Sequence, residues 1–229
     1  MRKISALFVF ITMVMTSTFA FAAKNCPANL IPMYEGVTKN EAMLKADENF
    51  LSATNRIAEE KKWTSNQLME HLVAKGWESF NDKQDPITAM KRFNQAWLMY
   101  PNNSGVYHGM AIMSLVIKGS NQYPHCPYSL SRAEILFEKA LAKEAPKPGV
   151  YADFGKLLFL QKRFEKAIDV LLTAVEMDPN IPPAYMHLGG SYAILEKYDD
   201  ACKWLRKAAE WKNIVPPNVV EEVCQKAKL

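Results

Sequence analysis

The stretch Gly149-Val-Tyr-Ala-Asp-Phe-Gly155 is followed 34 residues later by Pro183-Ala-Tyr-Met-His-Leu-Gly189. The similarity continues well beyond these seven residues, because small and large apolar residues keep the same spacing in both copies. A sequence that repeats at a period of 20 to 50 residues folds as stacked copies of one supersecondary unit. The paired positions are Tyr151 and Tyr185, Gly155 and Gly189, Ala167 and Ala201, Leu171 and Leu205, and Ala174 and Ala208.

This period and this order of residues resemble the tetratricopeptide repeat (TPR) family, in which each repeat is a helix-turn-helix. The resemblance implies an all-α fold, a right-handed α-solenoid of about four helix pairs with a capping helix at each end. The paired Gly and Ala positions are then those where two helices approach closely. The aromatic and leucine positions fill the space between repeats. We therefore interpret the repeated tyrosines, alanines and glycines as scaffold.

The same spacing locates two further repeats upstream. Gly105-Val-Tyr107 matches Gly149-Val-Tyr151, but ten extra residues precede the second helix and predict a loop at 118–130, which contains two prolines. In the first repeat Ala89, Phe93, Ala96 and Pro101 match the second half of the pattern, whereas Gly76-Trp77 fits in two registers one residue apart. The predicted solenoid domain spans 38–229, with repeats at about 65–101, 104–147, 148–181 and 182–213, and a C-terminal capping helix at 217–228.

Helix starts are marked by capping sequences. Thr38-Lys-Asn-Glu41, Thr64-Ser-Asn-Gln67 and Ser131-Arg-Ala-Glu134 have the pattern of a capping box. Asp85-Pro86 supplies an N-cap side chain and a proline at the first helical position. The helix after Thr38 is predicted to reach Lys62 and to cover the first repeat, with its inward face formed by Met43, Ala46, Phe50, Ala53 and Ile57. Residues 23–37 predict an extended tail lying across the fold.

The first 22 residues predict a secretory signal peptide. Arg2 and Lys3 precede a short apolar run, and Ala20-Phe-Ala22 is a small-x-small cleavage site. The run is too short to span a membrane, and no second run follows, so we expect no integral membrane segment after cleavage. Cleavage lowers the formal net charge from +4 to +2, which gives no argument for nucleic-acid binding. The expected location is the periplasm, with secretion as the alternative.

Four cysteines remain after cleavage, and an oxidising compartment favours disulfides between them. Four cysteines allow three pairings. We prefer Cys202–Cys224, which would connect the last repeat to the C-terminal helix, and by default Cys26–Cys126. The alternative is that they are free buried thiols, because a chain of this length does not need disulfides to fold.

The remaining positions of the first helices line the concave face in this family, so the resemblance assigns them to partner binding. Most are apolar or small, and one is a lysine. Such a surface suits an amphipathic helix or an extended apolar peptide. A family pattern that binds C-terminal carboxylates is matched here only by Lys156. The alternative is that the tail or the capping helix covers some of these groups. The groove positions are His108, Ile112, Leu115, Ala152, Lys156, Phe159, Met186, Gly190 and Ala193.

No catalytic motif is present, and the sequence predicts neither a catalytic residue nor a metal site or cofactor. Two alternatives remain open: an enzyme dependent on the Cys126 thiol or on a metal near His125, and a module that only self-associates. A weak metal site could involve His108, Asp153 and His187. The preferred prediction is a non-catalytic periplasmic adaptor that holds a peptide or helix of a cell-envelope partner, in assembly or secretion of an envelope complex.

Overall fold

The computed structural model describes residues 26–120 and 122–227. Over this range the chain forms ten α-helices, two short 3-10 helices and no strand, which confirms the all-α prediction. None of the helices in these residues is both long and apolar enough to cross a membrane. The predicted signal peptide, residues 1–22, lies outside the described part of the chain.

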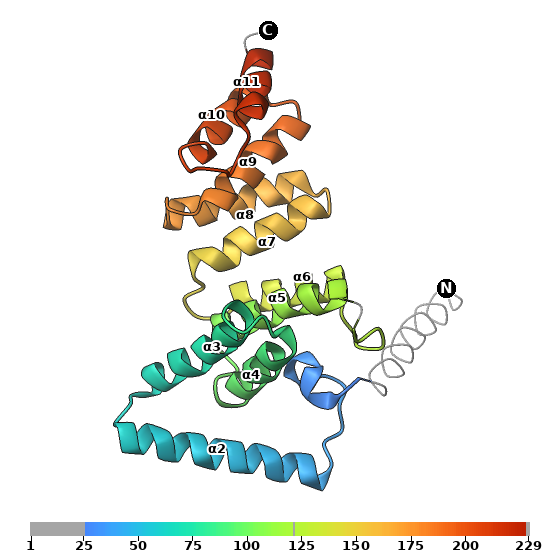
Figure 1. Cartoon of the computed structure of the whole chain (residues 1–229), viewed down its shortest axis with the longest axis vertical. Coiled ribbons are helices and arrows are strands. Elements are labelled where there is room, and N and C mark those ends of the chain that lie inside the picture. The colour runs from blue at the N-terminus through green and yellow to red at the C-terminus, as the bar shows by residue number, and fades with distance from the viewer. Residues whose placement is uncertain (1–25, 121, 228–229) are drawn as a thin grey trace, which may run out of the picture. The chain divides into compact units, whose positions relative to one another are not determined.

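Two compact units divide the chain between Leu136 and Phe137, within α6. In the first unit α3 packs against α4 and α4 against α5 (Figure 1). Gln84, in the turn between α3 and α4, has a positive φ of 53°. The helices of this unit are α2 (Glu41–Lys61), α3 (Ser65–Asn81), α4 (Pro86–Met99), α5 (Ser104–Ser120) and the beginning of α6 (Leu130–Leu141).

The ring of Phe93 is the centre of the first unit. A methyl group built on Gly76 of α3 would lie 2.5 Å from Phe93 Cε1, and one built on Gly109 of α5 would lie 2.2 Å from it. Phe93 is fully buried and also meets Trp77 edge-on, with ring centroids 5.3 Å apart. Glycine on both flanking helices is therefore what lets α3 and α5 approach α4. The structure also settles the register of the first repeat: Gly76, not Trp77, is its close-approach residue.

Two of the four expected N-caps are formed by other residues. The Thr64–Gln67 capping box is present, and Asp85 accepts from the Thr88 amide as predicted. The helix expected after Thr38 instead begins at Glu41, where the Asn40 side chain accepts from the Met43 amide at 2.9 Å. Ser129 caps α6 through the Arg132 amide at 2.9 Å. In both cases a short side chain closer to the helix start satisfies the amide that the predicted cap would have reached.

The N-terminal helix α2 covers the first repeat less completely than its pattern predicts. Only Thr54 of α2 is buried, although the helix contacts α4. Of the predicted inward residues, Ala46 and Ala53 are exposed, and the Ile57 side chain is 41% exposed. Two cavities of about 390 and 240 Å³ lie along Phe50 on its inner side. The apolar surface of α4 is closed mainly by another segment, the N-terminal tail.

The tail is not extended. Its described part forms two 3-10 turns, η1 (Ala28–Leu30) and η2 (Pro32–Tyr34), which pack on α4. A disulfide joins Cys26 to Cys126 across 100 residues of sequence. Cys126 belongs to the predicted loop insertion, which is shorter than 118–130 because α5 continues to Ser120 and α6 begins at Leu130.

The second unit consists of antiparallel helix pairs that repeat the same packing. A methyl group on Gly155 would lie 2.4 Å from Leu171 Cγ, and one on Gly189 would lie 2.7 Å from Leu205 Cγ. Each leucine thus packs onto the glycine of its own helix pair. The turns repeat as well, because Lys162 and Glu196 both have positive φ, at 61° and 59°. The helices are α7 (Pro148–Leu160), α8 (Phe164–Met177), α9 (Pro182–Ile194), α10 (Tyr198–Ala208) and α11 (Pro217–Lys226).

Contacts between successive repeats use the tyrosine position. The Tyr185 hydroxyl donates to the Pro179 carbonyl at 3.1 Å, and its ring stacks on Trp204 and Trp211. In the first unit the Tyr107 hydroxyl donates to the Pro101 carbonyl at 2.7 Å, over the same interval of six residues. Cys202 is bonded to Cys224, joining α10 to α11. Both disulfides are the pairings preferred from the sequence.

Replacement of Gly109 by alanine tests the packing around Phe93. The added methyl group would overlap the buried ring, so we expect Gly109→Ala to lower the free energy of unfolding by about 1–3 kcal/mol. Gly119 is the matched control in the same helix, because a methyl group there meets nothing within 4 Å. Gly119→Ala should leave stability unchanged or raise it by up to about 1 kcal/mol. Urea denaturation measures both; equal effects of the two substitutions would contradict the packing argument.

Candidate functional site

The predicted groove residues of the first unit lie on α5. His108, Ile112 and Leu115 are all half-buried there. The His108 ring meets Trp77 of α3 edge-on, with ring centroids 5.2 Å apart. His108 is therefore partly committed to packing, and Ile112 and Leu115 leave a modest apolar strip on the same helix.

The predicted groove residues of the second unit lie on α7 and α9, two helices that contact each other. Lys156 is exposed, whereas Ala152 is buried. Half-buried residues complete the set: Phe159, Met186, Gly190 and Ala193. Their surface is thus apolar with one cationic group, as the sequence predicts.

Phe159 organises this part of the surface. Its ring lies over α9, with Cε2 3.2 Å from the position that a methyl group on Gly190 would take. It also contacts His187 and Phe164, with ring centroids 5.1 and 5.6 Å apart. The sequence interpretation treated Gly190 as space left for a ligand. In the structure that space is filled by Phe159, so Phe159 is a wall of the site and Gly190 is the surface on which it rests.

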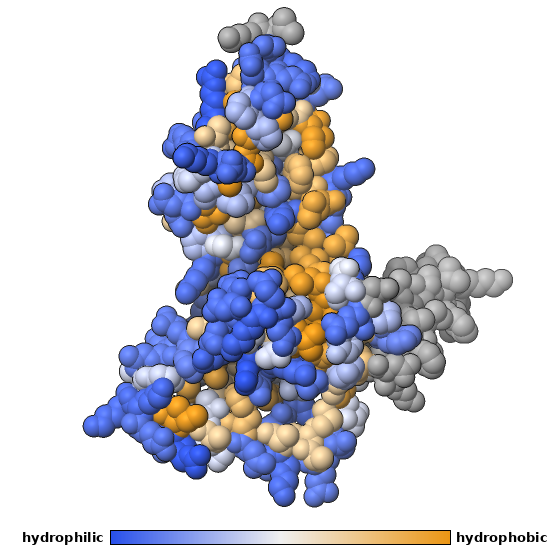
Figure 2. Space-filling model, in the orientation of Figure 1, coloured by the Kyte–Doolittle hydropathy of each residue, from blue (hydrophilic) through white to orange (hydrophobic). Residues whose placement is uncertain are grey.

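Two exposed apolar residues were missed from the sequence. Leu160 is 62% exposed and Ile194 is 51% exposed, and they end α7 and α9 at positions 34 residues apart. Aliphatic side chains of this size are rarely left so exposed at equivalent positions without a partner. Figure 2 shows apolar surface on the second unit, among hydrophilic residues. The signal was present in the sequence, because both residues directly follow predicted groove positions, Phe159 and Ala193.

Electrostatics in this site centre on His187. Burial of the ring is the main cause that lowers its pKa from 6.5 to about 4, and the positive charge of Lys156 acts in the same direction. The negative charge of Asp153 opposes them. His187 is therefore neutral at neutral pH, and Lys156 provides the positive charge of the surface.

The alternative chemistry suggested by the sequence is not assembled. Cys126 is bonded to Cys26 and has no thiol in this structure, while the neighbouring His125 is exposed. Asp153 and His187 interact across α7 and α9, but His108 belongs to the other unit. Among the described residues no three His, Cys, Asp or Glu side chains are grouped as metal ligands.

A separate hollow of about 910 Å³ lies where α11 meets the end of α10. Trp211 and Val215 form its apolar part, next to the Cys202–Cys224 disulfide. Arg206, Lys212 and Glu221 surround it with charges of both signs. Because this lining favours no particular ligand charge, we assign the candidate site to the α7–α9 surface instead.

Comparison with known proteins gives the same fold. A family model described as tetratricopeptide repeat matches residues 148–181 and 182–214. No curated protein matches the sequence as a relative. Similar solved structures include PilF of Pseudomonas aeruginosa (19% identity, 70% of this chain and 69% of that one, TM-score 0.54) and YrrB, a TPR protein with an unusual peptide-binding site (18%, 70% and 75%, 0.51). PilW, a widely conserved type IV pilus biogenesis factor, is similar at 17% identity over 80% of this chain and 82% of that one, with a TM-score of 0.50.

The buried His187 predicts a loss of stability in acid. Its pKa is lowered on folding, so the unfolded chain binds the proton more readily. Its contribution to stability is complete above pH 6.5 and is lost as the pH falls toward 4. Between pH 7 and pH 4, we expect the wild-type chain to lose on the order of 2 kcal/mol more than His187→Gln. Urea denaturation at each pH measures the difference, in which the carboxylate titrations common to both chains cancel. Parallel pH profiles would show that His187 is not desolvated.

Proposed function

Since the chain belongs to the tetratricopeptide repeat family, we propose that it is a non-catalytic adaptor that binds a peptide or helix of a cell-envelope protein. The observation that carries the proposal is the pair Leu160 and Ile194, exposed by 62% and 51% on neighbouring helices of the second unit. Repeat proteins bind partners on such continuous surfaces rather than in closed pockets. The adaptor class is also supported by the solved structures that share the fold, one of which has a peptide-binding site.

The chemistry of the α7–α9 surface defines the partner. Leu160, Ile194 and the half-buried Met186 offer aliphatic and thioether groups, which adapt to a variety of apolar side chains. The exposed Lys156 lies on α7 between the buried Ala152 and Phe159. The best match is an amphipathic helix or an extended apolar peptide with an acidic residue beside its apolar face.

An envelope role is supported by two features. Both cysteine pairs are disulfide-bonded, as is typical of exported proteins. PilW, which shares the fold, is described as a type IV pilus biogenesis factor. We propose the periplasm as the location, reached through the predicted signal peptide, and assembly or secretion of an envelope complex as the process.

The export proposal predicts the N-terminus of the mature protein. Purified from the cell envelope of the source organism, the chain should begin at Ala23, because cleavage is expected after Ala22. N-terminal sequencing and the intact mass check this directly. A chain that retains Met1 to Ala22 in the cytoplasm would contradict the export proposal, and it would leave the interaction surface unaffected.

Charged substitutions test the interaction surface. Leu160→Asp combined with Ile194→Asp places two carboxylates on it without changing buried groups, so partner binding should fall by at least about tenfold. Met177→Asp is the matched control, because Met177 is an apolar residue of the same unit, 48% exposed, and lies on α8. Photo-crosslinking from positions 160, 194 and 177 in intact envelopes, read by mass spectrometry, measures partner contact.

The crosslinks distinguish the two remaining interpretations. A heterologous protein crosslinked from 160 and 194, but not from 177, supports the adaptor function. Crosslinks to a second copy of the chain, together with dimerisation on sedimentation, would instead favour a self-association module. Equal crosslinking from all three positions would contradict a defined surface on α7 and α9.

A further inference from the structure

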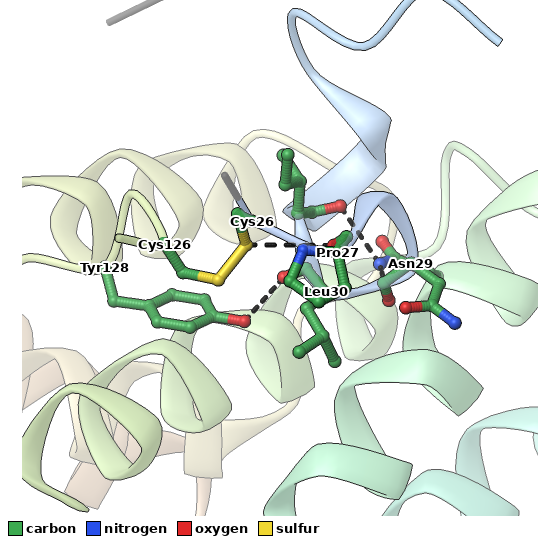
Figure 3. The surroundings of a disulfide bond; sticks show 8 residues. Cys26, Pro27, Asn29, Leu30, Cys126 and Tyr128 are labelled. Atoms are coloured by element: carbon green, nitrogen blue, oxygen red, sulfur yellow. Dashed lines mark hydrogen bonds between the residues drawn. A yellow bond between two sulfur atoms is a disulfide. The ribbon is translucent and has the colours of Figure 1, made fainter. Parts of the chain in front are cut away.

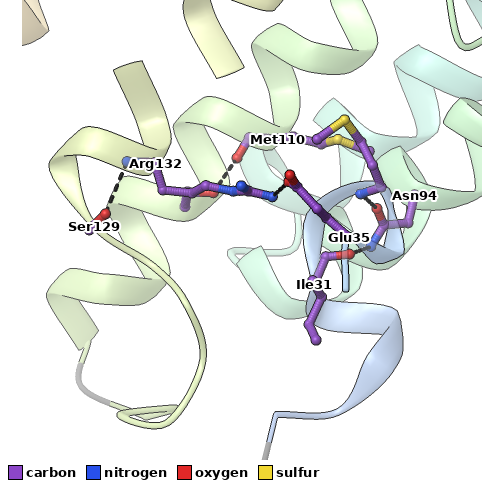
Figure 4. A network of polar contacts seen from close by, with 8 residues as sticks. Ile31, Glu35, Asn94, Met110, Ser129 and Arg132 are labelled. Carbon is purple, nitrogen blue, oxygen red and sulfur yellow. Dashed lines mark hydrogen bonds and ion pairs between the residues drawn. The ribbon is translucent and has the colours of Figure 1, made fainter. Parts of the chain in front are cut away.

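A second peptide-like ligand site is already occupied in the first unit, by the chain itself. We call residues 26–35 the strap, and the α4, loop and α6 residues that hold it the seat. Asn94 of α4 is fully buried beneath the strap and bonds to it three times. Its Oδ1 accepts from the Met33 amide at 2.8 Å, and its Nδ2 donates to the carbonyls of Asn29 and Ile31 at 2.9 and 3.0 Å (Figure 4). One side chain thus reads the strap backbone on both sides of its turn.

The loop and α6 complete the seat. The Tyr128 hydroxyl donates to the Leu30 carbonyl at 2.6 Å, beside the Cys26–Cys126 disulfide (Figure 3). Burial raises the pKa of Tyr128 above its usual value, so the hydroxyl stays a donor. The guanidinium of Arg132, 5% exposed, pairs with the Glu35 carboxylate (Figure 4). These three side chains belong to parts of the chain 34 or more residues apart from one another or adjacent to the loop, and all converge on ten residues of strap.

Burial adds an apolar component to the recognition. Leu30 and Ile31 are 1% and 0% exposed, so two successive aliphatic side chains enter the core of the unit from the strap. The strap therefore shows both elements of peptide recognition: its backbone is held by polar side chains, and pockets accept its side chains.

The strap does not adopt this shape by local preference. Met33 and Tyr34 have φ values of 58° and 52°, which non-glycine residues rarely adopt, least of all in succession. Such conformations persist where the surrounding contacts over-determine them. The seat, rather than the strap, accordingly encodes the bound conformation.

We propose that the seat is a second peptide-binding site, separate from the α7–α9 surface, which the strap occupies in cis while the Cys26–Cys126 disulfide is closed. The ligand it accepts in trans is a tightly turned peptide with two consecutive aliphatic residues followed by proline and, three residues later, an acidic residue. Leu30-Ile31-Pro32 and Glu35 define this pattern, and the strap of a second copy satisfies it. Opening the disulfide makes the site exchangeable.

The opening step is ordinary thiol–disulfide exchange. A thiolate of a dithiol reductant attacks one sulfur of the Cys26–Cys126 bond, and the other cysteine leaves as a thiolate. The second thiolate of the reductant then resolves the mixed disulfide. The protein gains two thiols, and the dithiol becomes a disulfide. A peptide that carries a cysteine at the position of Cys26 can afterwards be joined to Cys126 by the reverse exchange.

The test measures this capture on the full mature chain carrying Cys26→Ser, in a glutathione redox buffer. The probe is a synthetic peptide of residues 26–37, and its control is a peptide of the same composition that keeps the first cysteine and scrambles the rest. The tethered strap competes at an effective concentration of about 1 mM, so the peptides are supplied at several times that level. Peptide mapping by mass spectrometry quantifies the fraction of Cys126 captured.

We expect the native peptide to be captured at Cys126 about tenfold more than the scrambled one, because only it can fill the seat. Asn94→Ala should abolish this preference, whereas Asn66→Ala, at an exposed asparagine of α3, should retain it. A peptide with Ile31→Asp should also lose the preference, since it would bury a carboxylate. This peptide change cannot unfold the protein. Equal capture of native and scrambled peptides, or a preference that survives Asn94→Ala or Ile31→Asp, would overturn the proposal.

Discussion

The close contact between a glycine on one helix and a large side chain on the next is the constraint on which the rest of the structure depends. Leu171 occupies the volume over Gly155, and Leu205 the volume over Gly189, in helix pairs that repeat every 34 residues. In the first unit Phe93 takes this role toward two glycines, Gly76 and Gly109. Because a single methyl group would not fit at these contacts, helix spacing is set by the absence of a side chain. The faces that remain exposed follow from that spacing.

Partner-binding chemistry arises where the same helices have no further neighbour to cover them. On α7 and α9 the buried rows carry the repeat pattern, while Leu160 and Ile194 end their helices in solvent. Phe159 lies between these two functions, since its ring packs on Gly190 and His187 and also borders the exposed surface. Substitutions at Phe159 would therefore combine a packing defect with a binding defect. The exposed aliphatic residues are better probes of function for that reason.

The first unit solves a different problem, which is how to end the stack. The pattern of α2 suggests that this helix closes the array, yet the strap places Leu30 and Ile31 in the core and covers Asn94 of α4. A buried asparagine costs free energy unless its donors and acceptor are all satisfied, and here the strap backbone satisfies them. The cover and the polar group beneath it are therefore interdependent. A disulfide formed across 100 residues keeps them together.

The sequence alone determined the repeat period, the all-α class, most helix boundaries and the preferred cysteine pairs, because these depend on local spacing and on residue types. It also located the face on which Lys156 and Phe159 lie. Tertiary structure decided the features that depend on residues distant in the chain: the register of Gly76 against Phe93, the filling of the space over Gly190, and the exposure of Leu160 and Ile194. The strap is the clearest case. Its left-handed turn at Met33 and Tyr34 has no local signature, since it is imposed by Asn94, Tyr128 and Arg132, which lie between 60 and 100 residues away and approach only once the helices have packed.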